Sequence, residues 1–426
     1  MAANEKNPPQ GRFRRLARMA EASVRTGTSA LMRQTHQQSV KKAAEILGDL
    51  RGLAAKTGQM AAYVDGLVPE HQREAYERWM QRLLDAAPSS SPQEVRARIE
   101  EELGQTIDAL FLSWEDQPFA SASIGQVHRA TLKSGEKVAV KVQHPGVDNA
   151  LESDLRNLGL MESMASVTGA RQFGSKDALQ AVQERLREEL DYRLEAKHQM
   201  HFAELHQDDS QIVIPKVHTE YSSRHVLTSE LMEGGISFQE ACAATEEERR
   251  QWCETLWRFV FRGTLVGGVF NADPHPGNYI FFPKGRVAFL DFGCVQHLDE
   301  DYRNQAIAVH QAALAGREED FAYHVCAMLG TRGGDYEAWA LGYVRRCFEP
   351  LFESPYRFTR EYAASMVQGI KDIATQSMWK RGSDFVPLPP HMVMMNRLQC
   401  GFYSVLARLD CEVDYAAVER CSLGLG

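Results

Sequence analysis

The chain has 426 residues, of which 44% are hydrophobic and 25% are charged, and its formal charge is −9. This composition is that of an ordinary globular protein with material for two or three domains or lobes. The acidic balance argues against a nucleic-acid-binding protein. The apolar passage at 259–270 contains an arginine and three glycines, well short of the roughly 20 apolar residues that a membrane span needs, so we expect no transmembrane helix.

The eight cysteines are scattered, with no CxxC pair, and no signal peptide precedes them. Cysteines used in this way are typical of a chain that stays in a reducing compartment. The sequence therefore predicts a cytoplasmic setting.

Charge is unevenly placed along the chain. Residues 1–44 contain nine Lys or Arg and two Glu, a charge of +7, so the rest of the chain carries −16. Within 1–35, Phe13, Leu16 and Val24 have near-helical spacing among arginines, as in a helix that rests on an anionic membrane surface. A solvated tail and an organellar transit peptide fit the same residues, so peripheral membrane contact, a free tail and organellar targeting all stay open.

Residues 36–115 are predicted to form a helical extension. The spacing of apolar residues predicts one helix over 36–65 and a second over 70–84. The stretch PSSSP breaks this pattern, and Pro92 opens another helix that ends near Gly104.

Residues 116–235 are predicted to form a small β-rich lobe with inserted helices. The period changes to that of strands in FASASIGQVHRATLKSGEKVAVKVQ, where Ser134 and Gly135 make a turn between two strands. Helices are expected over 148–167 and 178–206, and two further short strands follow.

From Phe238 onward the pattern is helical, apart from the stretch 270–293, and we interpret residues 236–426 as a helical C-terminal lobe. Helices, a small sheet and a larger helical half are the layout of a bilobal α+β protein with an N-terminal extension.

The stretch FNADPHPGNYIFFPKGRVAFLDFG carries the predicted chemistry. In ADPHPGN, two prolines and a glycine preclude a helix, so a rigid loop can hold Asp273 and Asn278 at set positions. Phosphoryl transfer needs a carboxylate that orients and deprotonates the acceptor, and an Asn and a second carboxylate that hold Mg²⁺. Asp273 as the catalytic group, with Asn278 and Asp291 as metal ligands, matches these parts in type, order and spacing.

Lys141 in VAVK supplies the strand lysine of such a site, and the positions of a G-x-G-x-x-G-x-V loop precede it. The residues predicted to cover the phosphates are Ala120, Ser121, Ala122, Ser123, Gly125 and Val127. Two of the usual glycines are alanines here, and a Cβ limits how closely backbone N–H groups approach phosphates, so we expect altered nucleotide binding. Taken singly, these residues also fit plain turns and a solvated strand lysine; their order favours the nucleotide site.

Two further segments complete the predicted site. EELDYRLEAKH offers Glu189 as the carboxylate partner of Lys141, and Asp191 on the same helical segment to face the metal or the N-terminal extension; a solvated acidic patch is the alternative. VLTSELMEGG resembles a strand that enters a kinase hinge, where the C=O of Glu230 and the N–H of Met232 would contact adenine. A plain strand and turn fits those letters equally.

The segment after Asp291 departs from that of usual protein kinases. It turns helical from about Asp299, and no APE triplet occurs in the chain. An extended peptide substrate therefore has no obvious platform.

Six motifs in order resemble the UbiB-type atypical kinases, also called aarF-domain-containing kinases. They span roughly residues 45–300 and read AAKTGQM, FASASIGQVHRA, VAVKVQHPGV, EELDYRLEA, ADPHPGN and LDFG. The resemblance implies a protein-kinase-like fold, with ATP and Mg²⁺ as cofactors. It places Lys56 and Gln59 in a KxGQ motif, on a helix that folds over the active site and occupies the place of a protein substrate. It also makes the Glu189–Asp191 pair a family feature.

The resemblance further implies an ATPase or a lipid-associated kinase, many of which are linked to ubiquinone or other isoprenoid lipids. We therefore expect ATP hydrolysis or phosphoryl transfer that is gated by the KxGQ helix and coupled to a lipid or hydrophobic small molecule. A small-molecule phosphotransferase and an ATP-binding pseudokinase scaffold are the alternatives. Asn271 stands where the family usually has His, which puts the bracing of the catalytic loop in doubt.

Overall fold

The computed structural model describes residues 64–65, 90–122, 124–148, 188, 190–379, 386 and 390–422. The predictions for residues 1–35, Lys56, Gln59, Ser123 and Glu189 lie outside the described residues. The described chain falls into two compact units. The first holds residues 90–193 within those ranges together with His218–Leu231, and the second holds residues 64–65, Leu194–Val217 and the chain from Met232 onward.

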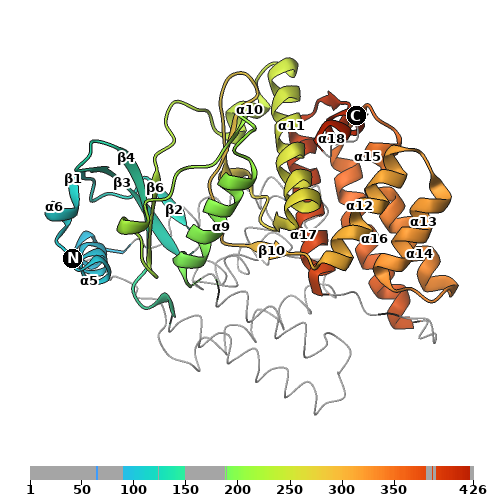
Figure 1. The fold of residues 1–426 in the computed structure, drawn as a ribbon, viewed down its shortest axis with the longest axis horizontal. Coiled ribbons are helices and arrows are strands. Elements are labelled where there is room, and N and C mark those ends of the chain that lie inside the picture. Colours follow the sequence, from blue (N-terminus) through green and yellow to red (C-terminus); the bar gives the residue numbers. More distant parts are fainter. Residues whose placement is uncertain are drawn as a thin grey trace, which may run out of the picture. The chain divides into compact units, whose positions relative to one another are not determined.

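The first unit is built on a five-stranded antiparallel sheet (Figure 1). Its main path runs in the order β1 (Phe111–Trp114), β3 (Gly125–Leu132), β4 (Lys137–Gln143) and β6 (Val226–Glu230), and β2 (Ala120–Ala122) pairs with β3. The strand, turn and strand that the sequence predicts for β3 and β4 are confirmed.

One face of this sheet is buried by alternating valines, as the two-residue period of a strand requires. Along β4, Val138, Val140 and Val142 are each 1% exposed or less. The helix α5 (Pro92–Leu103) contributes Val95 and Ile99 to the same core. The short helix α6 (Ile107–Leu110) and the 3-10 turn Thr219–Tyr221 complete the described elements of this unit.

The predicted limits of α5 are confirmed, and its caps explain them. The Ser91 hydroxyl accepts from the N–H of Glu94, and the Glu94 side chain accepts from the N–H of Ser91. At the other end, Gly104 adopts a left-handed conformation with φ +68°, which a glycine reaches at little cost.

Two small sheets of the second unit lie within residues 212–297. In one, β5 (Ile212–Val213) runs parallel to β9 (Val287–Phe289), which pairs with β8 (Tyr279–Phe281) in a hairpin. In the other, β7 (Val269–Asn271) pairs antiparallel with β10 (Val295–His297). The boundary between the units falls within α9 (Tyr192–Leu205), whose later residues belong to this unit.

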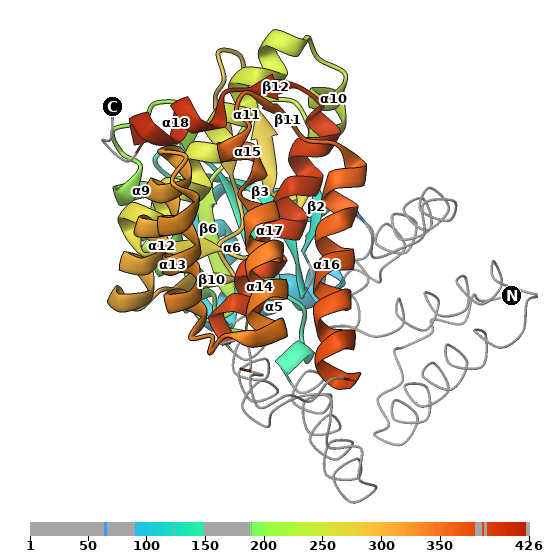
Figure 2. The same ribbon diagram turned by 90° about the vertical axis from the view of Figure 1, so that its right-hand side faces the viewer.

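Helices make up most of the second unit. They are α10 (Phe238–Cys242), α11 (Glu246–Phe261), the π-helical turn Arg262–Gly267, α12 (Glu300–Leu314), α13 (Glu318–Leu329), α14 (Gly334–Cys347), α15 (Glu349–Phe352), α16 (Arg360–Trp379), α17 (Pro390–Leu409) and α18 (Tyr415–Ser422). The two-residue strands β11 (Tyr356–Arg357) and β12 (Glu412–Val413) pair with each other. Helices α12, α13, α14 and α16 lie side by side in sequence order, and α17 packs beside α16 (Figures 1 and 2).

This architecture confirms the predicted α+β, two-lobed class, with the sheet in one unit and most helices in the other. The helix predicted from about Asp299 is also confirmed, because Asp299 caps α12 by accepting from the N–H of Tyr302 at 2.8 Å. Among the residues that the structure describes, no helix combines the length and the apolar content needed to cross a membrane.

Candidate active site

The predicted catalytic loop connects β7, a strand of one small sheet of the second unit, with β8, a strand of another. It starts after Asn271, the last residue of β7, and contains Asp273 and Asn278, which precede β8. A single 3-10 turn closes this loop, because its prolines preclude a longer helix. Asp291 follows β9 and precedes β10. Pairing of β8 with β9 and of β7 with β10 therefore gathers the three predicted residues in one region of the unit.

Asn271 ties the catalytic loop to the segment that contains Asp291. Its side-chain amide donates a hydrogen bond to the carbonyl oxygen of Asp291 at 2.6 Å, and its side-chain oxygen accepts one from the N–H of Asp273 at 3.1 Å. An Asn side chain can do both because it carries a donor and an acceptor. The bracing that the missing His put in doubt is therefore present.

Asn278 and Asp291 offer oxygen atoms of the kind that Mg²⁺ binds. The amide nitrogen of Asn278 donates to the carbonyl oxygen of Asp273 at 3.2 Å, which turns its Oδ1 away from that bond. One carboxylate oxygen of Asp291 accepts from the N–H of Gly293 at 2.9 Å, which fixes the carboxylate orientation. Within the described ranges no three His, Cys, Asp or Glu side chains form a metal-binding group. Two oxygen ligands fit Mg²⁺, which is commonly held by one or two protein groups together with phosphates and water.

Asp273 is paired with Arg397 of α17, a residue to which the sequence analysis assigned no role. Nη2 of Arg397 lies 2.8 Å from Oδ1 of Asp273, and each side chain is 15% exposed. Nη1 of the same guanidinium lies 3.8 Å from Sγ of Cys294. A charge-assisted hydrogen bond of this kind is strong and directional, so it fixes the Asp273 carboxylate and engages one of its oxygens.

A second carboxylate that the sequence analysis missed lies beside the DFG segment. Glu195 of α9 is 5% exposed. Its Oε2 lies 3.6 Å from the point where a Cβ on Gly293 would stand, and Oδ1 of Asp291 lies 3.2 Å from that point. Two neighbouring carboxylates favour a bound cation. The spacing of 192, 195 and 199 places Glu195 on one helix face with Tyr192 and Gln199, and only the structure shows that all three are buried.

The phenylalanine of the DFG segment is a core residue. Phe292 is fully buried, and its ring centroid lies 5.2 Å from that of Phe202 and 6.4 Å from that of Phe259. The ring Nδ1 of His198 lies 3.2 Å from the carbonyl oxygen of Phe292. Helix α9 therefore fixes both the side chain and the backbone of this segment.

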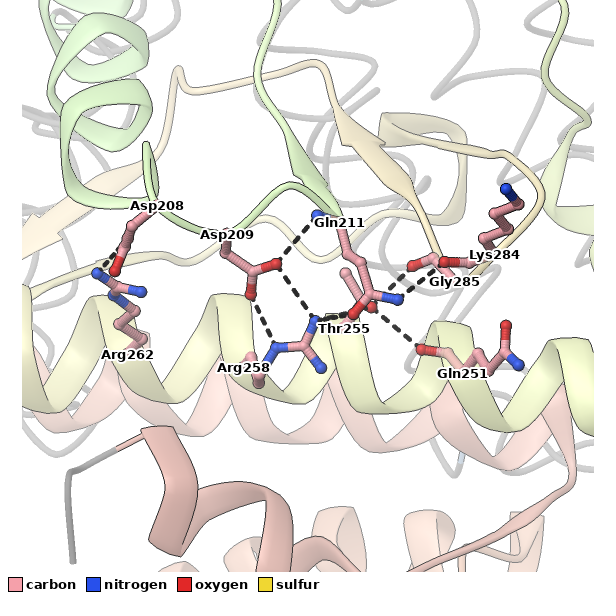
Figure 3. A network of polar contacts seen from close by, with 9 residues as sticks. All are labelled: Asp208, Asp209, Gln211, Gln251, Thr255, Arg258, Arg262, Lys284 and Gly285. Carbon is pink, nitrogen blue, oxygen red and sulfur yellow. Dashed lines mark hydrogen bonds and ion pairs between the residues drawn. The ribbon is translucent and has the colours of Figure 1, made fainter.

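The turn of the β8–β9 hairpin is fastened to α11 (Figure 3). The Thr255 hydroxyl donates to the carbonyl oxygen of Gly285 at 2.7 Å, and the Gln211 amide donates to that of Lys284 at 2.8 Å. Nε of Arg258 donates to Oδ2 of Asp209 at 2.8 Å, and its Nη2 donates to Oε1 of Gln211 at 2.7 Å. Burial alone would raise the pKa of Asp209, but the hydrogen bond and charge of Arg258 lower it. These contacts fix the hairpin that carries both predicted metal ligands at its ends.

Lys141 stands on β4 of the first unit, opposite Val127 on one side and Leu227 on the other. Its Nζ lies 5.0 Å from the centroid of the Tyr192 ring, which is almost fully buried. A cation over an aromatic face is a favourable contact. It keeps the lysine side chain at the sheet rather than in solvent.

The described residues among those predicted to cover the phosphates lie on the paired strands β2 and β3. β2 ends at Ala122, and Ala120 lies opposite Val127 in the ladder. Gly125 has no room for a side chain, because a Cβ there would lie 2.3 Å from the carbonyl oxygen of Val142. Backbone pairing therefore determines the shape of this segment.

Asp191 is not on a helix, and that part of the prediction is wrong. It precedes α9, and its carboxylate accepts from the N–H of Arg193 at 3.1 Å. A short acidic side chain is favoured at such a helix start because it satisfies a backbone N–H there. Nε and Nη2 of Arg193 also donate to it at 2.9 and 2.6 Å, and these bonds lower the pKa of Asp191. Its predicted contact with a metal or with the N-terminal extension stays a prediction.

The strand predicted before the hinge is confirmed as β6, which ends at Glu230. The N–H of Leu231 donates to the carbonyl oxygen of Lys137 at 3.1 Å, which extends the pairing with β4. The contacts of Glu230 and Met232 with adenine stay predictions.

Comparison with known proteins adds family information to this geometry. The family model described as the ABC1 atypical kinase-like domain matches residues 82–324. The chain is 28% identical over 434 residues to the atypical kinase COQ8B, mitochondrial, of Rattus norvegicus, covering 96% of this chain and 80% of that protein. It is 36% identical over 244 residues to the protein ACTIVITY OF BC1 COMPLEX KINASE 3, chloroplastic, of Arabidopsis thaliana, covering 55% of this chain and 34% of that one.

An uncharacterised protein of Mycobacterium tuberculosis is 33% identical to this chain over 303 residues, which are 70% of this chain. The match covers 61% of the length of that relative. Among solved structures, the complex of Mycobacterium tuberculosis Rv3197 with erythromycin matches with a TM-score of 0.63 and 27% identity, covering 93% of this chain and 97% of that one. These matches support the protein-kinase-like form of the α+β fold.

Proposed function

This chain belongs to the ABC1 atypical kinase-like family, of the UbiB type, and we propose that it binds ATP with Mg²⁺ and transfers or hydrolyses the terminal phosphoryl group. In this proposal Lys141 contacts the phosphates, and Asn278 and Asp291 hold the metal. Asp273 orients and deprotonates the acceptor, which is a hydroxyl group or water. Bound Mg²⁺ neutralises the negative charge of the phosphates.

The observation that carries the proposal is the double hydrogen bond of Asn271. It connects the backbone of the proposed base, Asp273, with that of the proposed metal ligand, Asp291. Phosphoryl transfer depends on the relative position of acceptor, phosphate and metal, and little on covalent chemistry by the protein. A brace between these two backbone segments is what such positioning requires.

The acceptor side of the proposal is a lipid or another hydrophobic small molecule. It rests on the resemblance to UbiB-type kinases and on the absence of an APE triplet from the sequence. Lys56, Gln59 and Asp191 would regulate access, and the basic residues 1–35 would give peripheral contact with an anionic membrane.

The test is ATP turnover by the full chain, with and without anionic liposomes and isoprenoid phenols. Asp273→Asn keeps the size of the side chain but removes the base, so turnover should fall by a factor on the order of 10² or more while Mg·ATP binding persists. Asp301→Asn, an exposed acidic residue at the start of α12, is the matched control. Equal turnover by the Asp273 variant and the unmodified chain would remove Asp273 from the chemistry.

One observation favours the pseudokinase alternative. Arg397 already engages Oδ1 of Asp273 at 2.8 Å, so one of the two carboxylate oxygens is held by the guanidinium instead of facing an acceptor hydroxyl. A scaffold would bind ATP tightly in a calorimetric titration, with no turnover that depends on Asp273. Arg397→Met discriminates the two functions, because only an enzyme would show a changed turnover number at unchanged ATP affinity.

A further inference from the structure

Two cysteines far apart in the sequence meet in the core of the second unit. Cys253 of α11 and Cys411, which follows α17, are 158 residues apart, and their sulfur atoms lie 3.2 Å from each other. Both thiols are free, with exposures of 0% and 2%. Neither belongs to the proposed nucleotide site.

We propose that Cys253 and Cys411 are a modification site, where a peroxide converts the two thiols into a reversible intrachain disulfide. A disulfide needs the two sulfurs to approach to about 2.05 Å. From the 3.2 Å of the reduced arrangement, the distance between them has to shorten by only about one ångström.

The local charges identify Cys411 as the attacking thiol. The segment that precedes it is held by two arginines: Arg249 donates to the carbonyl oxygens of Leu409 and Asp410, and Arg357 donates to that of Asp410. The hydrogen bond between the two thiols, followed by the charges of the two arginines, lowers the pKa of Cys411, whereas burial raises that of Cys253. A thiolate is the reactive form of cysteine.

The reaction balances with hydrogen peroxide as the oxidant. The Cys411 thiolate attacks one peroxide oxygen, which forms a sulfenic acid and releases water once the leaving hydroxide takes a proton. The Cys253 sulfur then attacks the sulfenic sulfur, an S–S bond forms, and a second water leaves with the Cys253 proton. Two sulfurs lose two electrons in total, and the peroxide gains them.

The disulfide would connect α11 with the segment that follows α17, and both helices serve the candidate active site. Cys253 lies on α11 beside Trp252, which donates to the carbonyl oxygen of Phe282, and two residues before Thr255, which holds the same hairpin turn. Cys411 lies just beyond α17, the helix of Arg397, and β12 packs against α11. Oxidation would therefore restrict the movement of these two helices relative to each other.

The experiment treats the full chain with hydrogen peroxide, blocks remaining thiols with N-ethylmaleimide in denaturant, and identifies cross-linked peptides by mass spectrometry. We expect a Cys253–Cys411 peptide that dithiothreitol removes. Cys347→Ala, which removes another buried thiol, whose Sγ lies 3.8 Å from Sδ of Met366, should leave the cross-link intact. Cys253→Ala and Cys411→Ala should each abolish it. The oxidised chain should melt about 2 to 5 °C higher than the reduced one, since a cross-link restricts the unfolded state.

Recovery of both cysteines as maleimide adducts after peroxide treatment would overturn the proposal. A cross-link that forms only when denaturant is present during oxidation would do the same. If one alanine variant fails to fold, the peptide map of the unmodified chain still decides, because it reports which two cysteines are joined. None of these readouts depends on ATP binding or turnover, so the inference is tested separately from the proposed function.

Discussion

The two segments that we propose to act on one nucleotide are held in place in opposite ways. The β2–β3 hairpin of the first unit is fixed by its backbone ladder, and Gly125 leaves no room there for a side chain. The catalytic loop of the second unit is fixed by side chains, those of Asn271 and Arg397. A segment shaped by its backbone should tolerate most side-chain changes but not a new Cβ at its glycine. A loop held by side chains should lose part of its catalytic geometry when one of them is truncated.

The largest expected effect is at the metal ligand of the second unit. Asp291→Asn removes a full negative charge from the proposed cation site, so Mg²⁺ is held less tightly and the negative charge of the phosphates is no longer neutralised. Mg·ATP affinity should therefore fall by a factor on the order of 10² or more. Isothermal titration with and without Mg²⁺ measures the loss. Asp301→Asn is the control, and unchanged Mg·ATP affinity in the Asp291 variant would exclude a metal-ligand role.

Gly125→Ala tests the backbone-shaped hairpin. The added Cβ would lie 2.3 Å from the carbonyl oxygen of Val142 and 3.0 Å from the hydroxyl of Tyr192. Since β4 is central in the sheet, the strands have to shift, at a cost on the order of 3 kcal/mol in the free energy of unfolding. Gly135→Ala, in an open turn with φ +93°, should cost only about 1 kcal/mol. Denaturant unfolding that gives equal losses for the two variants would contradict this account of the hairpin.

Two buried histidines extend the comparison to pH. His128 of the first unit is hydrogen-bonded through Nδ1 to the carbonyl oxygen of Glu115 and through Nε2 to Gln126. His206 of the second unit is 2% exposed, and neither ring nitrogen has a hydrogen bond within the described part of the chain. Burial, followed by the nearby charge of Arg262, lowers the pKa of His206 to about 4.

His206 should make the second unit sensitive to acid. The folded state keeps the ring neutral, whereas the unfolded chain takes up a proton below its ordinary pKa of about 6.5. Stability from this group is therefore complete above that pH and declines as pH falls towards 4, by about 3 kcal/mol in total. His206→Phe, which keeps an aromatic ring against those of Phe202 and Phe259, should flatten the pH profile of unfolding. An identical slope in the variant would show that other groups cause it.

Asn271→Ala should have the smallest effect of the series and the most selective one. The change removes both hydrogen bonds of the brace, so the Asp273 and Asp291 backbones lose their fixed spacing. We expect turnover to fall about 10-fold with little change in melting temperature, because the site is only partly buried. Asn271→His, which restores the family's usual residue, should recover part of the activity. Full activity of the alanine variant would remove the brace from the proposed mechanism.

Much of the fold could be predicted from local patterns. The limits of α5 follow from Ser91, Pro92 and Gly104, and the β3–β4 hairpin from alternating valines around a Ser-Gly turn. Asp191 shows where this reasoning fails: its helical neighbours suggested a helix, yet the side chain satisfies the N–H of Arg193 at the helix start. Helix boundaries depend on such hydrogen bonds, which residue periodicity does not contain.

The sequence by itself determined which residue types bear the proposed chemistry, because Asp273, Asn278 and Asp291 belong to short motifs whose spacing is set by one loop and one hairpin. Only the tertiary structure decided which groups surround them. Arg397 reaches Asp273 across 124 residues, and Glu195 reaches the DFG segment from a helix almost a hundred residues earlier. Cys253 and Cys411 meet in the same way. Such contacts arise from how the helices pack, and the packing depends on the shape of the whole buried core rather than on any local spacing.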